Sequence, residues 1–225
     1  MKLLAIDTAA DLCAACVFDT QSGELGRSVL DIGKGHAEHL MAVVTEALQA
    51  AGAAYADLDG LAVSIGPGSF TGVRVGVAAA RGFALALKIP ALGVTTLEAV
   101  SAETAEDWPG RSVMVAIGSR PEGLSVQLFD GSGTALIEAS AMPAQAAAKE
   151  ALRVGAVLAG NGACLIAEAA GGGFDLGPAA ATADIATYAR IASVKNFGGP
   201  PPKPLYLREP DAKPQAGFAL ARKER

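Results

Sequence analysis

Residues 61–88 read LAVSIGPGSFTGVRVGVAAARGFALALK, an apolar run that breaks into glycine and proline and then resumes with helical spacing. The segment Leu61 to Ile65 is short and apolar, and Gly-Pro-Gly follows it, which is typical of a buried strand that ends at a turn. Ser69 or Thr71 can cap the next helix, because either hydroxyl can accept a hydrogen bond from a free amide of the first turn. We therefore predict a strand, a tight loop and a helix over residues 69–88.

This helix has two sides of different character. Steps of about 100° per residue place small or apolar residues on one side and cations on the other. The first side carries Gly72, Gly76, Ala79 and Phe83, and the basic side carries Arg74, Arg81 and Lys88. A glycine inside a helix costs about 1 kcal/mol relative to alanine. The repeated glycines therefore predict that another segment, of this chain or of a partner, comes close to the helix.

The glycine-rich loop matches neither common phosphate-binding motif. The P-loop pattern GxxxxGK[ST] needs a lysine that this loop lacks, and Thr71 stands where the pattern GxGxxG has its third glycine. A tight turn with close helix packing is the simpler interpretation.

Composition predicts a folded, soluble, cytoplasmic protein. The chain has 225 residues, of which 51% are apolar, and this is ample for a hydrophobic core. A net charge of −5 argues against a general nucleic-acid binder, although local basic patches remain compatible with it. We expect no membrane span, because no apolar run approaches the necessary length of about 18 to 20 residues, and no signal peptide.

The three cysteines, Cys13, Cys16 and Cys164, predict no disulfide framework. Residues three apart on a strand point to opposite faces, so Cys13 and Cys16 are not expected to pair or to share a metal. We interpret both as small buried apolar residues.

Before and after the central stretch, periodicity predicts the other elements of the first half. A helix from His36 to Ala51 should stop at Gly52, and Thr95 or Thr96 should cap a later helix that continues to about residue 103. The expected strands cover residues 3–7, 13–19, 25–30 and 91–94.

The pattern then repeats with an offset of 111 residues, which maps Ile6 onto Ile117 and Phe18 onto Phe129. The repeat predicts strands over 113–117, 124–129, from 135 onward and over 154–159, helices over 144–152 and 163–170, and a last helix over 184–194 that Thr182 caps. We expect an N-terminal lobe over residues 1–106 and a C-terminal lobe with its tail over 107–225.

A duplicated three-strand meander followed by alternating helices and strands is similar to the two-lobed α/β fold of the actin, sugar kinase and Hsp70 superfamily. In that superfamily a nucleotide lies between the lobes, and the leading strand of each lobe ends near phosphate and magnesium. Asp7 and Thr8 occupy this position in the first copy, whereas Gly118 stands in place of the second carboxylate. Magnesium prefers oxygen ligands, so we predict a degenerate nucleotide site at Asp7, Thr8, Gly118 and Asn161, with no cofactor.

The run IGPGSFTGVRVG at residues 65–76 resembles the signature of the bacterial TsaB family, also called YeaZ. Four further segments resemble the family: LLAIDTA at 3–9, HAEHL at 36–40, GVTTLEAV at 93–100 and PLYLREP at 204–210. The sequence IGSRPEG at 117–123 departs from the Asp-Ala-Arg more frequent in the family, which weakens a nucleotide contact by the second lobe.

The resemblance implies a subunit without catalytic residues in the machinery that installs threonylcarbamoyl on tRNA adenine. In that family the homologous partner TsaD carries the metal and transfers the group from an adenylate made by TsaC, while the ATPase TsaE cycles the complex. The implied contact with TsaD, or with a second copy in a homodimer, uses the two N-terminal helices. On this chain we assign it to His36, His39, Leu40, Val44, Leu48, Val73, Val77, Ala80 and Ala84. Contact with tRNA is expected only within the complex, through Arg74, Arg81 and Lys88, with help from residues 222–225.

Two other functions compete with this interpretation. A phosphotransferase of the same fold would use Asp7 and Thr8 near phosphate and Asn161 near the nucleoside, but the pattern offers no general base. A metallopeptidase needs HExxH or an equivalent ligand set, whereas His36 and His39 are separated by only two residues. We therefore expect neither a native metal site nor catalytic residues.

Overall fold

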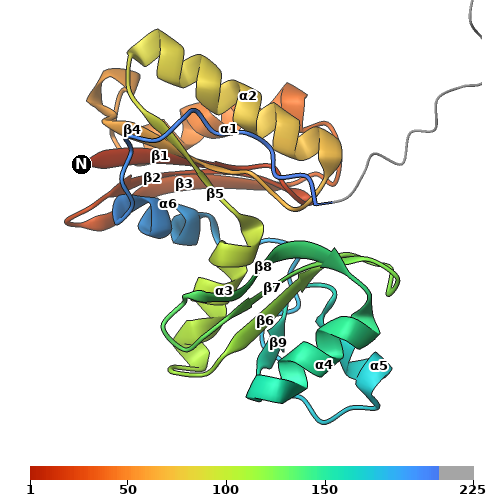
Figure 1. Ribbon diagram of the computed structural model, residues 1–225. Coiled ribbons are helices and arrows are strands. Elements are labelled where there is room, and N and C mark those ends of the chain that lie inside the picture. The colour runs from red at the N-terminus through yellow and green to blue at the C-terminus, as the bar shows by residue number, and fades with distance from the viewer. Residues whose placement is uncertain (208–225) are drawn as a thin grey trace, which may run out of the picture.

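The computed structural model of the chain describes residues 1–207 (Figure 1). Residues 208–225 lie outside the described residues, and with them the end of the 204–210 segment and the basic run at 222–225. The described part contains two mixed sheets, and helices pack on both.

The first sheet has the strand order β3-β2-β1-β4-β5. Its first three strands form the predicted antiparallel meander, and β4 and β5 run parallel to β1. The bounds of the strands are Lys2–Asp7 for β1, Leu12–Asp19 for β2, Gly23–Asp31 for β3, Gly60–Ser64 for β4 and Ala91–Val94 for β5.

Helices cover both faces of this sheet (Figure 1). Helices α1 (His36–Ala50) and α2 (Phe70–Leu87) lie on one face, with a short 3-10 turn at Tyr55–Asp57 between them in sequence, and α6 (Ile185–Ser193) lies on the other. Cys13 belongs to the core under α1 and α2, whereas Cys16 belongs to the core around α6. The prediction that these two side chains occupy opposite faces is confirmed.

The second sheet repeats the meander in the order β8-β7-β6-β9. Its strands are β6 (Val113–Ile117), β7 (Leu124–Phe129), β8 (Ala135–Met142) and β9 (Val157–Ala159), and its own helices are α4 (Ala144–Val154) and α5 (Ala163–Ala170). The predicted repeat is confirmed. The predicted start of the last strand at Val154 is wrong, because α4 continues to Val154 and ends at Gly155, whose φ of +62° suits glycine.

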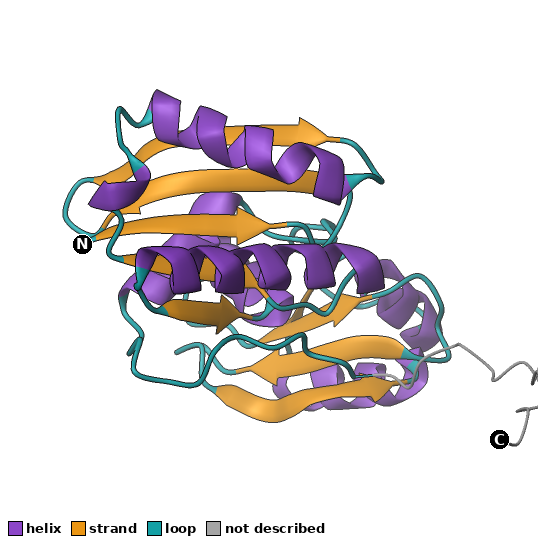
Figure 2. Cartoon of the chain, turned by 90° about the horizontal axis from the view of Figure 1, so that it is seen from above, coloured by secondary structure: helices purple, strands orange, loops and turns teal. Residues whose placement is uncertain are grey.

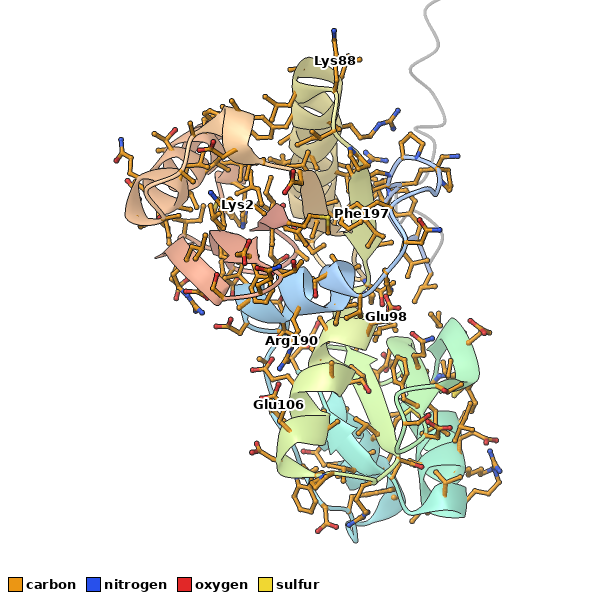
Figure 3. All side chains as sticks on the ribbon, turned by 90° about the vertical axis from the view of Figure 1, so that its left-hand side faces the viewer. Lys2, Lys88, Glu98, Glu106, Arg190 and Phe197 are labelled. Carbon is orange, nitrogen blue, oxygen red and sulfur yellow. The ribbon has the colours of Figure 1, made fainter. Side chains whose placement is uncertain are left out.

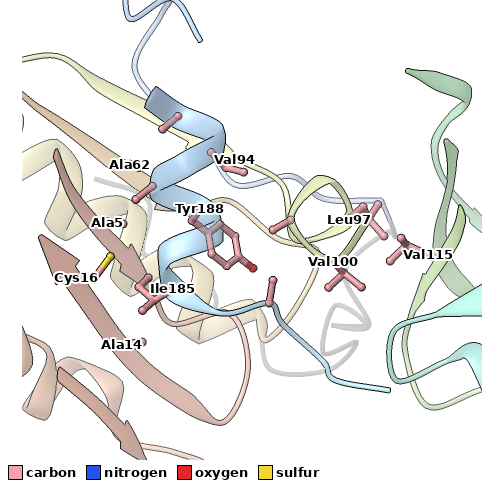
Figure 4. Packing of buried hydrophobic residues seen from close by; sticks show 14 of the residues in the cluster. Ala5, Ala14, Cys16, Ala62, Val94, Leu97, Val100, Val115, Ile185 and Tyr188 are labelled. Atoms are coloured by element: carbon pink, nitrogen blue, oxygen red, sulfur yellow. The ribbon is translucent and has the colours of Figure 1, made fainter. Parts of the chain in front are cut away.

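The two halves exchange a helix. Helix α3 (Thr96–Asp107) follows the first sheet in sequence but packs on β6, β7 and β9 of the second. Helix α6 follows the second sheet and packs on the first (Figure 4). Thr95 caps α3 as predicted, and Glu98 completes the capping box. The predicted lobe boundary at 106/107 remains a prediction.

The segment that comes close to the glycines of α2 belongs to this chain. A Cβ atom added to Gly72 would lie 2.0 Å from the carbonyl oxygen of Thr8, and one added to Gly76 would lie 2.5 Å from the Thr8 hydroxyl oxygen. The Thr8 hydroxyl donates a hydrogen bond of 2.8 Å to the carbonyl oxygen of Gly72. The glycines therefore allow the backbone of α2 to lie directly against the end of β1.

Helix α2 differs from one sequence expectation. With 18 residues it is long and apolar enough to cross a membrane by length and composition alone, and it is the one such helix within residues 1–207. The sequence argument overlooked it because Arg74 and Arg81 interrupt the apolar run. Five of its residues, which include Val73 and Val77, are buried in the core of the first sheet, so α2 is a partly buried core helix.

We predict that Gly72→Ala lowers the free energy of unfolding by about 1–3 kcal/mol, because the added methyl group overlaps the Thr8 backbone. Gly82→Ala in the same helix is the matched control, since a Cβ there meets no atom within 4 Å. The control should gain up to about 1 kcal/mol. Urea denaturation measures both, and equal stability of the two variants would show that close packing at Gly72 is not required.

Candidate functional site

A buried carboxyl group lies at the carboxyl end of β1. Asp7 is 1% exposed, and one of its oxygens accepts a hydrogen bond of 2.9 Å from the backbone N–H of Ala9. Its other oxygen accepts a hydrogen bond from the hydroxyl of Thr182. The Thr182 oxygen lies 2.7 Å from the hydroxyl oxygen of Tyr188. Figure 4 shows Tyr188 on α6. Two segments of the chain that are 175 residues apart therefore meet at this carboxyl.

Burial dominates the electrostatics of this group. Loss of hydration raises the pKa of Asp7, although hydrogen bonds from Thr182 and Ala9 oppose that rise. Burial, reinforced by the charge of Asp7, also raises the pKa of Tyr188. Tyr188 therefore keeps its proton and can donate to Thr182, while Thr182 donates to Asp7. We call this chain of hydrogen bonds the Asp7 relay.

The role predicted for Thr182 is wrong. Asp184 is the N-cap of α6, and its carboxylate accepts a hydrogen bond of 2.8 Å from the N–H of Ala186. Thr182 lies two residues earlier, and its hydroxyl faces Asp7 instead.

The residues predicted to mark a nucleotide site form two separate pairs. Asp7 adjoins Thr8, whose hydroxyl is engaged with Gly72. In the second half, the side-chain oxygen of Asn161 accepts a hydrogen bond of 2.9 Å from the N–H of Gly118. No hydrogen bond joins one pair to the other within the described chain.

Most of the residues assigned to a partner contact are buried in this chain. Seven are at most 6% exposed, and these are His36, Leu40, Val44, Leu48, Val73, Val77 and Ala80. The six apolar members belong to one core between α1, α2 and the first sheet. Their helical spacing marks the face of each helix that packs on the sheet of this chain. These residues are therefore core residues, and their assignment to a partner contact is corrected. His39 is exposed and Ala84 is half-buried, and both remain candidates for a contact.

The exposed apolar residues of the same helices lie one step around each helix. Met41 of α1 is 53% exposed and Leu85 of α2 is 82% exposed. Figure 2 shows both helices across one face of the first sheet, and they contact each other. Thr45 is exposed one turn after Met41 on α1. On α2, Ala78 and Gly82 are exposed two turns and one turn before Leu85. We call Met41, Thr45, Ala78, Gly82 and Leu85 the α1–α2 outer face.

The predicted basic side of α2 is exposed. Arg74 and Arg81 line a shallow hollow together with Val77, Ala78, Pro204 and Tyr206, whereas Lys88 ends the helix away from that lining. Sequence reasoning missed Tyr206, which comes from a segment 132 residues away from Arg74.

The histidines lack the companions that a metal site needs. His36 is buried and its Nε2 atom has no hydrogen-bond partner, whereas His39 is exposed. Within residues 1–207, no three His, Cys, Asp or Glu side chains gather as metal ligands.

Ion pairs link the exchanged helices at the surface (Figure 3). Arg190 of α6 pairs with Glu106 of α3, and Lys195 lies 2.6 Å from Glu98. Exposed pairs of this kind contribute at most about 1 kcal/mol each. The buried core between α3 and α6 therefore matters more for joining the halves.

Comparisons with known proteins identify relatives of the whole chain and of its first half. A family described as TsaD, tRNA N6-adenosine threonylcarbamoyltransferase, matches residues 31–119. An uncharacterized protein of Mycobacterium tuberculosis strain H37Rv is 36% identical over 95% of this chain and 95% of its own length. The Escherichia coli tRNA threonylcarbamoyladenosine biosynthesis protein TsaB is 32% identical over 53% of this chain. The match covers 51% of that curated relative, so the chain spans about half of its length.

A solved structure matches nearly the whole fold. A Pseudomonas aeruginosa protein described as similar to peptidase YeaZ superposes with a TM-score of 0.78 at 24% identity, over 92% of this chain and 99% of that one. At this identity the likeness concerns the fold alone. The predicted two-lobed α/β fold of the actin, sugar kinase and Hsp70 type is confirmed.

Stability should depend on pH through Asp7. Its pKa is higher in the folded chain than in the unfolded chain, so its contribution to stability is present below about 4 and is lost as pH rises through the folded pKa. The Asp7→Asn variant is neutral at every pH because an amide does not titrate. Its oxygen can still accept a hydrogen bond from Ala9 while its NH₂ group faces Thr182. We predict that the free energy of unfolding of this variant, relative to wild type, rises with pH from about 4 upward.

Asp130→Asn is a control of opposite sign, because hydrogen bonds from Ser132 and Thr134 lower the pKa of Asp130. That residue contributes above its unfolded pKa and loses its contribution as pH falls. Urea denaturation at several pH values measures both variants. A constant deficit of Asp7→Asn at every pH would contradict the raised pKa of Asp7.

Proposed function

Because the chain belongs to the TsaB/YeaZ family, we propose that it is a non-catalytic subunit of the machinery that makes N6-threonylcarbamoyladenosine in tRNA. In this role it binds and supports the catalytic subunit TsaD in the cytoplasm. The ATPase TsaE joins them in the full complex, and tRNA is modified only within that complex.

The α1–α2 outer face is the observation that carries the proposed partner. It lies within the region 31–119 that resembles TsaD. Two homologous subunits can pair through equivalent helices about a pseudo-twofold axis. The face combines large exposed apolar residues, Met41 and Leu85, with the small residues Ala78 and Gly82. Small residues let helices approach closely, and apolar residues at the centre of an interface supply most of its energy.

The same face would serve a homodimer in the absence of TsaD. Isologous contact through one surface and heterodimer contact through the same surface exclude each other, so the partner displaces the second copy. His39 and Ala84 lie on the two helices and extend the proposed contact.

The surroundings of Asp7 support a role without nucleotide chemistry. A carboxylate that serves magnesium needs open access to the ion, and Mg²⁺ keeps several waters in its octahedral shell. Asp7 is enclosed and accepts hydrogen bonds from Ala9 and Thr182. Thr8 is likewise enclosed and engaged with Gly72. Neither residue is placed to receive a hydrated ion.

We predict that Met41→Glu combined with Leu85→Glu weakens binding to TsaD of the same organism at least about 100-fold, because carboxylates would be buried in an apolar interface. Both positions are exposed, so the free energy of unfolding should change by only about 0.5 kcal/mol. Leu152→Glu on α4, at a position 55% exposed, is the matched control and should bind as wild type. Titration calorimetry measures the affinities. Wild-type affinity of the double variant would remove this face from the interface.

The purified chain alone should not hydrolyse ATP above the rate in buffer, because Asp7 and Thr8 are enclosed. A coupled assay of ADP release with and without Mg²⁺ measures this. Turnover that follows the chain through two purification steps and is lost in Asp7→Ala would overturn the non-catalytic assignment.

A further inference from the structure

Arg74 packs against two aromatic rings that also contact each other, on the flank of α2 that faces the segment 203–207. The Arg74 guanidinium carbon lies 3.6 Å from the centre of the Phe70 ring, one helical turn earlier, and 5.5 Å from the centre of the Tyr206 ring. The Nε–H group of Arg74 donates a hydrogen bond of 2.6 Å to the Tyr206 hydroxyl oxygen. Stacking and this hydrogen bond restrict the arginine, so less conformational entropy is lost when it binds an anion.

The hydrogen-bonding capacity of this cluster is mostly unused. Within residues 1–207, four arginines pair with a carboxylate, namely Arg27, Arg111, Arg153 and Arg190. Arg74 and Arg81 make no such pair in that range. The terminal N–H groups of Arg74 also lack a described acceptor, and the Tyr206 hydroxyl keeps its own hydrogen to donate. These donors converge where no negative charge of the described chain meets them.

The hollow has room for a nucleotide unit. Its volume is about 410 Å³, and Arg74, Arg81, Pro204 and Tyr206 are among its lining residues. This volume lies within the range of about 300–1,000 Å³ that is usual for small-ligand sites. Phe70 is 48% exposed and Tyr206 is 49% exposed, so each ring offers surface to a partner.

The fold holds the Tyr206 side of the hollow in place. The backbone N–H of Leu205 donates a hydrogen bond of 2.8 Å to the carbonyl oxygen of Ile65, at the end of β4. Pro202 is buried, and Leu207 packs against the core around α6. Residues 202–207 are therefore anchored on both sides of Tyr206.

We propose that Phe70, Arg74, Arg81 and Tyr206 form an RNA-binding site, which we call the Arg74 site, that takes one phosphodiester and one stacked base. Guanidinium groups bind phosphate through paired N–H donors, and half-exposed aromatic rings stack on bases. The two rings contact each other and Arg74, and about half of each side chain stays exposed. An acidic peptide would satisfy the arginines but would offer no base to stack on that exposed surface. That the RNA is tRNA rests on the proposed function.

The Arg74 site and the α1–α2 outer face adjoin each other along α2, because Ala78 lines the hollow and also belongs to that face. Steps of about 100° per residue place Ala78 roughly 40° from Arg74 and roughly 60° from Arg81. Leu85 lies between Arg74 and Ala78. A bound TsaD and a bound RNA would thus adjoin each other along one helix.

Fluorescence anisotropy of a labelled, unmodified transcript of a tRNA that reads codons beginning with A tests the site on the full chain. Wild type should bind with an affinity that falls as salt rises. Arg74→Ala combined with Arg81→Ala should weaken binding at least tenfold and lower the salt slope by roughly 0.7–0.9, as expected for the loss of one phosphate contact. Arg120→Ala combined with Lys149→Ala removes the same charge at exposed positions elsewhere and should change affinity by less than twofold.

A second variant tests stacking separately from charge. Phe70→Leu keeps an apolar side chain but removes the ring, and it should weaken RNA binding about fivefold with an unchanged salt slope. Circular dichroism on heating checks that each variant is folded. Arg81→Glu is a further test of charge at the site, and it should fold as wild type because Arg81 is exposed.

Three outcomes would overturn the Arg74 site. They are no measurable binding of the transcript by wild type, equal affinities of the two double variants, and displacement of the transcript by polyglutamate as effectively as by unlabelled tRNA. The last would indicate an acidic protein partner. RNA binding that depends on Arg74 in a chain that does not bind TsaD would retain the site and reject the proposed function. TsaD binding by a chain whose RNA binding does not depend on Arg74 would retain the function and reject the site.

Discussion

The backbone of α2 meets the end of β1 at Gly72 and Thr8, where a single methyl group would not fit. This contact places the start of α2 beside the strand that carries Asp7. Ser69 caps the helix there by accepting a hydrogen bond from the Gly72 N–H. Since the angle of α2 over the sheet is set at this point, the contact also decides which residues of α2 are buried. Val73 and Val77 enter the core, and the remaining flanks of the helix stay available.

The Asp7 relay links the end of β1 to α6, the helix that follows the second sheet in sequence. Tyr188 is among the largest fully buried side chains, and its ring packs between the first sheet and α3 (Figure 4). Its hydroxyl contacts Thr182. A buried hydrogen bond of this kind is expensive to leave unmade, so α6 has a defined position on the sheet. The surface pairs of Arg190 and Lys195 add less, because water and salt screen them.

Local sequence predicted the local structure well. The strands, the cap at Thr95 and the offset of 111 residues follow from periodicity and turn chemistry, which act over a few residues. The glycines of α2 predicted a close approach but not its partner, because Thr8 lies 64 residues away. Thr182 and Asp184 are both good caps by residue type. Only the position of Asp7, 175 residues from Thr182, decides between them.

The candidate contact residues show why a site is harder to predict than a fold. Apolar spacing along α1 and α2 reports that a face is covered, and it does not report what covers it. Leu40 and Val77 satisfy that pattern because the sheet of their own chain lies beneath them. Met41 and Leu85 stand outside the pattern, and for this reason they are the residues whose exposure needs an explanation.

The net charge of this chain and the local charge beside Tyr206 have opposite effects on the binding of nucleic acid. The net charge of −5 governs the field at long range, which disfavours non-specific binding of nucleic acid. Within a Debye length of about 8–10 Å the nearest groups dominate instead. Beside Tyr206 these groups are Arg74 and Arg81 without a described carboxylate partner. An acidic protein with such a hollow rejects RNA in general and yet can hold one that another subunit has already brought into place.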